Sequence, residues 1–213
     1  WEPSLYIPLQ TQFTLFINGT NDKQFVMNIF TDTYAASTNE KFLRIKKEMP
    51  HGHGPGRAPE EIYDFADYVT SFKPAAVKPL TFTSETIKDN NEIDYQFEFN
   101  GSVDEAVLYY ATDTLQWKQD EYTWIAENAT FNKTGINGTI TAKVPDNAQV
   151  YFVNVKNTAT NKLYSSSMKY IFKDYDWYNY QTETFDTEIT NIFGGTLEEN
   201  ATNPKTNGIN NST

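Results

Sequence analysis

The stretch Thr11-Gln12-Phe13-Thr14-Leu15-Phe16-Ile17-Asn18-Gly19-Thr20-Asn21-Asp22 has the pattern of a buried strand that ends in a turn. Residues 24–35 then place apolar side chains at helical spacing, and residues 41–47 form a second apolar strand. A second helix is expected to begin at Pro59-Glu60-Glu61, because proline and carboxylates suit a first helical turn. This alternation predicts a parallel α/β layer within residues 1–75.

The hydrophobic period changes to two in the next part of the chain. Ile93-Asp94-Tyr95-Gln96-Phe97-Glu98-Phe99 alternates strictly, and further short strand patterns follow, separated by turn signals. Such spacing predicts an antiparallel β-sandwich over residues 76–172, of the immunoglobulin or fibronectin kind. Residues 173–213 form an acidic tail in which an aromatic cluster precedes an Asn/Thr-rich end.

Composition narrows the class of protein. The net charge of -11, without a cluster of lysine and arginine, argues against nucleic acid and anionic membranes as partners. No apolar run is long enough to span a bilayer, and the absence of cysteine excludes disulfides and thiolate metal sites. Because the first residue is Trp1, we expect a processed chain whose true start lies upstream.

The glycosylation pattern Asn-x-Ser/Thr occurs about twice as often as expected by chance. A chain of this composition would contain roughly three or four occurrences. It begins at Asn18, Asn100, Asn128, Asn132, Asn137, Asn200, Asn210 and Asn211. We predict a secreted or cell-surface glycoprotein, with Asn128, Asn132 and Asn137 as the best sites and Asn200 and Asn211 as further ones. The alternative is an Asn/Thr-rich composition without glycans.

The candidate catalytic residues lie in the first region. Both histidines of the chain, His51 and His53, follow the second strand in the glycine-rich segment 48–56, and Asp22 follows the first strand. Carboxyl ends of parallel strands share one sheet edge, so an aspartate that orients a histidine base is predicted there. Asp22 could instead serve only turn chemistry. His53 is an alternate base, or else a loop histidine that bonds backbone.

Other interpretations of single residues stay open at this point. The histidine pair lacks a third histidine or any cysteine, so we expect no metal site. Arg57 could hold a substrate carboxylate or pair with Glu60 or Glu61. Aromatic residues of the second region could form a sugar-stacking platform, although packing in a core is the more common role; they are Tyr109, Tyr110, Trp117 and Trp124.

Several segments resemble the last strands and helices of secreted α/β-hydrolases of the acetylxylan-esterase, acylaminoacyl-peptidase and PhoPQ-activated-protein type. The matching segments are residues 13–22, Phe42-Leu43-Arg44-Ile45, Met49-Pro50-His51-Gly52-His53-Gly54 and residues 59–67. Segments 106–113, 117–124, 150–154 and 165–167 are similar to the β-domain appended to such enzymes. The resemblance covers about residues 1–172. It implies the C-terminal part of an α/β-hydrolase parallel sheet followed by a β-sandwich, with Asp22 as triad acid and His51 as triad base.

One departure from that family pattern matters most. The chain contains no Gly-x-Ser-x-Gly, so it lacks the nucleophile elbow of the family. We therefore expect an upstream segment or an associated chain to supply the serine and to complete the sheet, since two parallel strands bury little surface. The substrate would be a small ester or amide or an acylated carbohydrate, and no cofactor is implied.

A second function class is kept open. The chain could be a non-catalytic extracellular glycoprotein or assembly subunit derived from a hydrolase. In that case the β-sandwich or the aromatic tail segment 175–193 would mediate association, including self-association.

Overall fold

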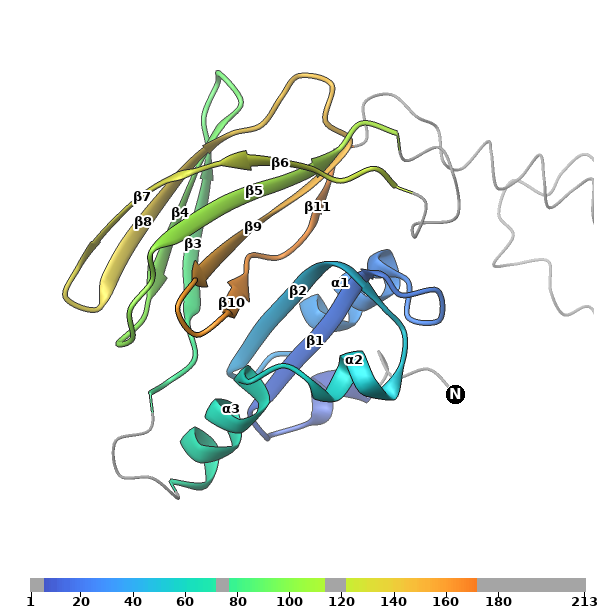
Figure 1. Ribbon diagram of the computed structural model, residues 1–213, viewed down its shortest axis with the longest axis vertical. Helices are drawn as coiled ribbons and strands as arrows, with labels where there is room; N and C mark the ends of the chain where they lie inside the picture. The colour runs from blue at the N-terminus through green and yellow to red at the C-terminus, as the bar shows by residue number, and fades with distance from the viewer. Residues whose placement is uncertain (1–5, 72–76, 114–121, 172–213) are drawn as a thin grey trace, which may run out of the picture. The chain divides into compact units, whose positions relative to one another are not determined.

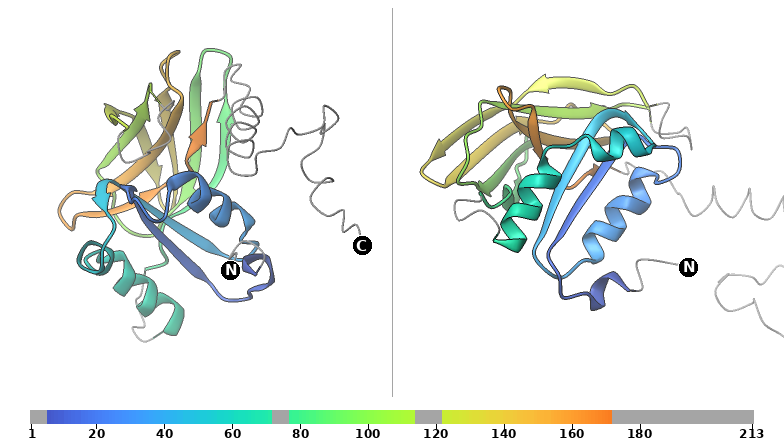
Figure 2. Two further views of the ribbon diagram at one scale, coloured as in Figure 1. Left: turned by 90° about the vertical axis from the view of Figure 1, so that its right-hand side faces the viewer. Right: turned by 60° about the horizontal axis from the view of Figure 1, so that its bottom comes forward.

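The computed structural model describes residues 6–71, 77–113 and 122–171 (Figure 1). The first range holds η2 (Ile7–Leu9), β1 (Thr14–Asn21), α1 (Met27–Ala36), β2 (Lys41–Pro50), α2 (His53–Arg57) and α3 (Glu61–Thr70). β1 and β2 pair in parallel, with Thr14 opposite Lys41 and Asn18 opposite Ile45. Phe16 and Phe42 point to opposite faces of this pair because side chains alternate along a strand. α1 packs on the Phe16 side and α3 on the Phe42 side (Figure 2).

The later ranges form two antiparallel sheets. Their strands are β3 (Thr81–Ile87), β4 (Glu92–Glu98), β5 (Glu105–Ala111), β6 (Ile125–Asn128), β7 (Thr130–Thr134), β8 (Asn137–Lys143), β9 (Val150–Asn157), β10 (Lys162–Ser165) and β11 (Lys169–Tyr170). One sheet has the order β3-β4-β8-β7. The other has the order β10-β9-β5-β6, with β11 paired to β9. β6 and β7 follow each other directly in the chain, yet they belong to different sheets.

The predicted fold class, an α/β-hydrolase sheet fragment followed by a sandwich, is wrong. Among the described residues antiparallel sheet predominates, and the only parallel pairing is that of β1 with β2. On the side of β2 away from β1, side chains take the place of a third parallel strand. The Ile45 N–H donates to Ser165 Oγ at 2.6 Å, and the Ile45 carbonyl accepts from Asn154 Nδ2 at 3.0 Å. The strand-helix alternation in the sequence of residues 1–75 therefore corresponds to one unit, β1-α1-β2, and not to part of a wider parallel sheet.

The central strands of the five-stranded sheet, β5 and β9, are buried on both faces. Leu108, Tyr110, Val153 and Val155 face the four-stranded sheet and form a core with its side chains. The alternate residues of the same two strands face the parallel pair, where they pack with Phe16, Met27, Leu43 and Ile45; they are Val107, Tyr109, Ala111, Val150 and Phe152. β5 and β9 therefore carry the apolar runs Ala106–Ala111 and Val150–Val153, as strands buried on two faces do.

Residues up to Ile171 form one compact unit. The predicted boundary near residue 76 falls in the segment between α3 and β3, part of which lies outside the described residues. The predicted tail, 173–213, lies outside them as a whole. In the described ranges no helix has the length and apolar character needed to cross a bilayer.

Candidate functional site

Asp22 and His51 meet at the carboxyl edge of the parallel pair. Asp22 is the residue after β1, and His51 is the residue after β2. Asp22 Oδ2 lies 3.0 Å from His51 Nδ1, which is hydrogen-bonding distance. The structure therefore brings together the two residues that the sequence placed at one sheet edge.

The Asp22 carboxylate is fixed by the turn that follows it. Its Oδ1 accepts hydrogen bonds from the backbone N–H groups of Gln24 and Phe25, both at 2.8 Å. The residue is only 8% exposed, so these bonds and the imidazole replace water around the charge. With Oδ1 committed to the backbone, Oδ2 is the oxygen that remains for His51.

The hydrogen bond to Asp22 determines which nitrogen of His51 can act as a base. An ionised carboxylate only accepts hydrogen bonds, so the proton of a neutral imidazole must sit on Nδ1. Nε2 then carries the lone pair. The His51 side chain is 33% exposed, and the Phe25 ring lies 5.5 Å from the imidazole at a tilt of 41°. Phe25 thus lies beside the imidazole, and among the described residues the only hydrogen bond of the His51 side chain is that of Nδ1 with Asp22.

Gly19 allows the ends of the two strands to approach each other. A Cβ atom built on Gly19 would lie 1.9 Å from the Met49 carbonyl oxygen. The pairing register shifts just after Gly19, and the N–H of Glu48 donates to Thr20 Oγ1 at 2.8 Å. Glu48 itself has a left-handed backbone, φ 59°. These local features bend the end of β2 toward β1 and carry His51 to Asp22.

Gly19→Ala is expected to lower the free energy of unfolding by about 1–3 kcal/mol, because the contacted atom is backbone and cannot move aside. It should also separate Asp22 from His51. Urea unfolding and the 15N NMR signals of the imidazole measure the two effects. Gly56→Ala is the matched control, since nothing lies within 4 Å of the position that its new methyl group would take, and its stability should change by less than about 0.5 kcal/mol.

Two further residues that build the site are not predicted from the sequence as part of it. Asn18 is 3% exposed; its Nδ2 donates to the Phe25 carbonyl at 2.7 Å and its Oδ1 accepts from the Gly19 N–H. Thr20 is 1% exposed. The Asn18-Gly19-Thr20 stretch has the pattern of a turn and a sequon, whereas β1 continues to Asn21. The only signal in the sequence is the polar composition directly before Asp22.

The other candidates in this region do not join the pair. His53 begins α2, and its imidazole makes no hydrogen bond or ion pair with any described residue. It is separated from His51 by Gly52, whose φ of 153° favours glycine. Arg57 is exposed at the end of α2 and forms no ion pair with Glu60 or Glu61 within the described ranges.

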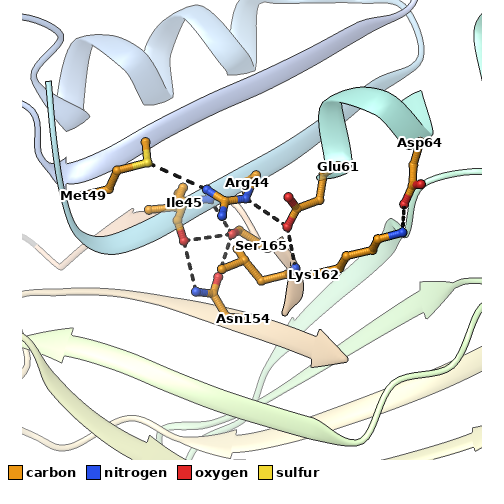
Figure 3. A network of polar contacts seen from close by, with 9 residues as sticks. Arg44, Ile45, Met49, Glu61, Asp64, Asn154, Lys162 and Ser165 are labelled. Atoms are coloured by element: carbon orange, nitrogen blue, oxygen red, sulfur yellow. Dashed lines mark hydrogen bonds and ion pairs between the residues drawn. The ribbon is translucent and has the colours of Figure 1, made fainter. Parts of the chain in front are cut away.

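Glu61 instead pairs with Arg44 in a buried polar network (Figure 3). Arg44 Nε lies 2.9 Å from Glu61 Oε1, and the side chains are 5% and 2% exposed. The N–H direction is too far off line for a hydrogen bond, so the contact is an ion pair by distance. Glu61 Oε1 also accepts from the Leu163 N–H at 2.6 Å. This network joins β2 and α3 to the hairpin of β9 and β10.

The structure also places the aromatic candidates. Tyr109, Tyr110 and Trp124 are buried at 6–8% exposure, in core positions rather than on an open platform. Trp117 lies outside the described residues. Within the described part of the chain, no three histidine, aspartate or glutamate side chains gather as a metal site would require.

Comparison with protein-family models and with curated proteins gives no relative. The sequence matches no family model, and no curated protein is significantly similar to it.

Proposed function

We propose that this chain contributes the acid and the base of a secreted serine hydrolase that cleaves esters or amides. The observation that carries the proposal is the hydrogen bond from His51 Nδ1 to a buried, backbone-anchored carboxylate. A histidine held in this way by aspartate is two thirds of a nucleophilic triad. The nucleophilic serine is assigned to a polypeptide segment outside the 213 residues.

In the proposed reaction, His51 Nε2 removes the proton from the serine hydroxyl as its oxygen attacks the substrate carbonyl. The imidazolium then returns this proton to the leaving alcohol or amine, and an acyl-serine remains. Water repeats both steps and releases the acid. Asp22 keeps Nδ1 protonated and stabilises the imidazolium. Phe25, which is 63% exposed beside the imidazole, offers an apolar contact for the substrate.

The proposed partner segment would lie next to β1. Among the described residues β1 pairs with β2 alone, so its other edge has backbone groups that a further strand can bond. An upstream segment of the same polypeptide or an associated chain would fit there. The substrate class follows from the resemblance described above, and acylated carbohydrates belong to it.

Labelling with a fluorophosphonate probe tests the proposed function. The protein is isolated from its natural source under native conditions, so that any continuous or associated segment is retained. A labelled serine is expected in that material, and its labelling should be lost in a His51→Gln variant but kept in a His53→Gln variant. Absence of label from all material that contains this chain would rule the proposal out.

Passage through the secretory pathway makes a separate prediction about glycans. Asn128, Asn132 and Asn137 are exposed on β6, β7 and the start of β8, whereas Asn18 is buried and hydrogen-bonded. β6 and β7 are edge strands of their sheets, where a glycan would also prevent strand pairing with other molecules.

We expect peptide mass spectrometry after deglycosylation in H₂18O to find label at Asn128, Asn132 or Asn137 and none at Asn18. The control is the same digestion without the glycosidase, which reports spontaneous deamidation. Unmodified asparagine at all three positions in the natural protein would argue against secretion. The candidate sites Asn200 and Asn211 lie outside the described residues.

A further inference from the structure

Two buried polar side chains share one face of β1, at the end of the strand that leads to Asp22. Asn18 and Thr20 are 3% and 1% exposed. They follow Phe16 at every second position, so all three side chains lie on the core side of the strand. An apolar side chain would fill either position without the free-energy cost of burying polar atoms. The hydrogen bonds of the two side chains therefore indicate their role.

Asn18 holds the turn that carries Asp22. Its Nδ2 donates to the Phe25 carbonyl at 2.7 Å, and its Oδ1 accepts from the Gly19 N–H at 2.8 Å, which fixes the orientation of the amide. The Phe25 N–H in turn donates to Asp22 Oδ1, and the Phe25 ring lies beside the His51 imidazole. Because that ring is largely exposed, its packing alone does not hold the turn. Asn18 therefore acts on both members of the pair through Phe25.

Thr20 holds the segment that leads to His51. Its Oγ1 accepts from the Glu48 N–H at 2.8 Å and donates to Asn21 Oδ1 at 2.9 Å. Glu48 has a left-handed backbone, φ 59°, which costs free energy in a residue other than glycine. The hydrogen bond to Thr20 stabilises this conformation three residues before His51. The two buried side chains thus hold the two segments that meet at the hydrogen bond between Asp22 and His51.

We propose that Asn18 and Thr20 are positioning residues, which keep the Asp22 turn and the His51 segment close enough for Asp22 to hold the imidazole proton on Nδ1. The inference rests on the proposed function, because it concerns the same pair. It also accounts for the sequence Asn18-Gly19-Thr20, which has the glycosylation pattern. Both polar residues of this pattern are used inside the protein, so it serves the site and not a glycan.

Variants of Thr20 separate positioning from packing. Thr20→Val keeps the shape of the side chain and loses the hydroxyl, whereas Thr20→Ser keeps the hydroxyl and loses a methyl group. The readout is the ratio of the Nδ1–H to the Nε2–H tautomer of His51, from imidazole 15N shifts in the 213-residue chain at a pH where the ring is neutral. His53, whose imidazole makes no hydrogen bond with any described residue, is the internal reference, and His53→Gln assigns the signals.

We expect Thr20→Val to lower this ratio at least about tenfold, the loss that follows when a charge-assisted hydrogen bond is broken. Thr20→Ser should lower it less than about twofold, since a serine hydroxyl also accepts from the Glu48 N–H. The tautomers of His53 should not change. An unchanged ratio in Thr20→Val, or a larger effect of Thr20→Ser, would show that Thr20 only fills space and would overturn the proposal.

Asn18→Ala tests the other segment, with Asn154→Ala as the matched control. Asn154 is 1% exposed and also donates to a backbone carbonyl, that of Ile45 at 3.0 Å. Both variants should lower the urea midpoint, but only Asn18→Ala should lower the tautomer ratio of His51, again about tenfold. Equal ratios in the two variants would refute the role of Asn18, and the Thr20 variants decide the matter if Asn18→Ala does not fold. The tautomer is measured without a nucleophile, so failure here is distinguishable from failure of the fluorophosphonate labelling.

Discussion

Asp22→Asn is expected to lower the kcat/KM of the assembled hydrolase about 10⁴-fold without unfolding the protein. The backbone N–H groups of Gln24 and Phe25 should keep the amide oxygen at the position of Oδ1. The amide NH2 then replaces Oδ2 and donates to His51 Nδ1. This moves the imidazole proton to Nε2, so the nitrogen that must accept the serine proton already carries one.

The tautomer change can be measured even where no nucleophile is present. In the 213-residue chain, 15N shifts should place the proton of neutral His51 on Nδ1, and on Nε2 after Asp22→Asn. Activity is measured on the assembled protein with an activated ester, and Asp89→Asn, an exposed turn residue, is the matched control. An unchanged tautomer, or a full rate with the variant, would remove Asp22 from the mechanism.

Glu61→Gln should lower the free energy of unfolding by about 3–5 kcal/mol, the cost of leaving a buried charge without its partner. Arg44 is 4% exposed and has no second carboxylate among its described contacts. With an unfolding slope of about 2 kcal/mol per molar urea, the midpoint should fall by about 2 M. Urea unfolding followed by tryptophan fluorescence measures this change.

The same helix supplies a control for Glu61→Gln. Asp64 also lies on α3 and pairs with β10 through Lys162 at 2.5 Å, but both side chains are about one third exposed (Figure 3). Asp64→Asn should therefore cost no more than about 1 kcal/mol. The double variant Arg44→Met with Glu61→Leu should recover more than half of the loss, since no unpaired charge remains. Equal losses for Glu61→Gln and Asp64→Asn would show that burial does not set the cost.

The contact between Asp22 and His51 could be predicted because it depends on local rules. Each residue directly follows an apolar strand, and two parallel strands joined by a helix bring such positions to one edge. Their catalytic role stays a prediction. The Arg44–Glu61 pair could not be derived in the same way, since it depends on how α3 lies on β2. A hint was present, because Arg44 interrupts the apolar run Phe42-Leu43-Arg44-Ile45.

The fold class failed because it depends on contacts between distant segments. One strand-helix-strand pattern is compatible with a wide parallel sheet and with a lone pair that packs on another layer. The deciding contacts are those of Ile45 with Asn154 and Ser165, more than 100 residues away in sequence. The apolar runs Ala106–Ala111 and Val150–Val153 were the available signal that β5 and β9 are buried on both faces.

A strand such as β9, with no solvated face, lacks the usual penalty against a shift in its pairing register. A register shift of one residue ordinarily exposes the apolar side chains of a strand to solvent. The free-energy cost of that exposure stabilises the correct pairing. In β9 a register shift of one residue would only move side chains from one apolar core to the other. Asn154 breaks this degeneracy, because its Nδ2 donates to the Ile45 carbonyl and its Oδ1 accepts from Ser165 Oγ. These hydrogen bonds of Asn154 thus favour one register of β9 over a register shifted by one residue.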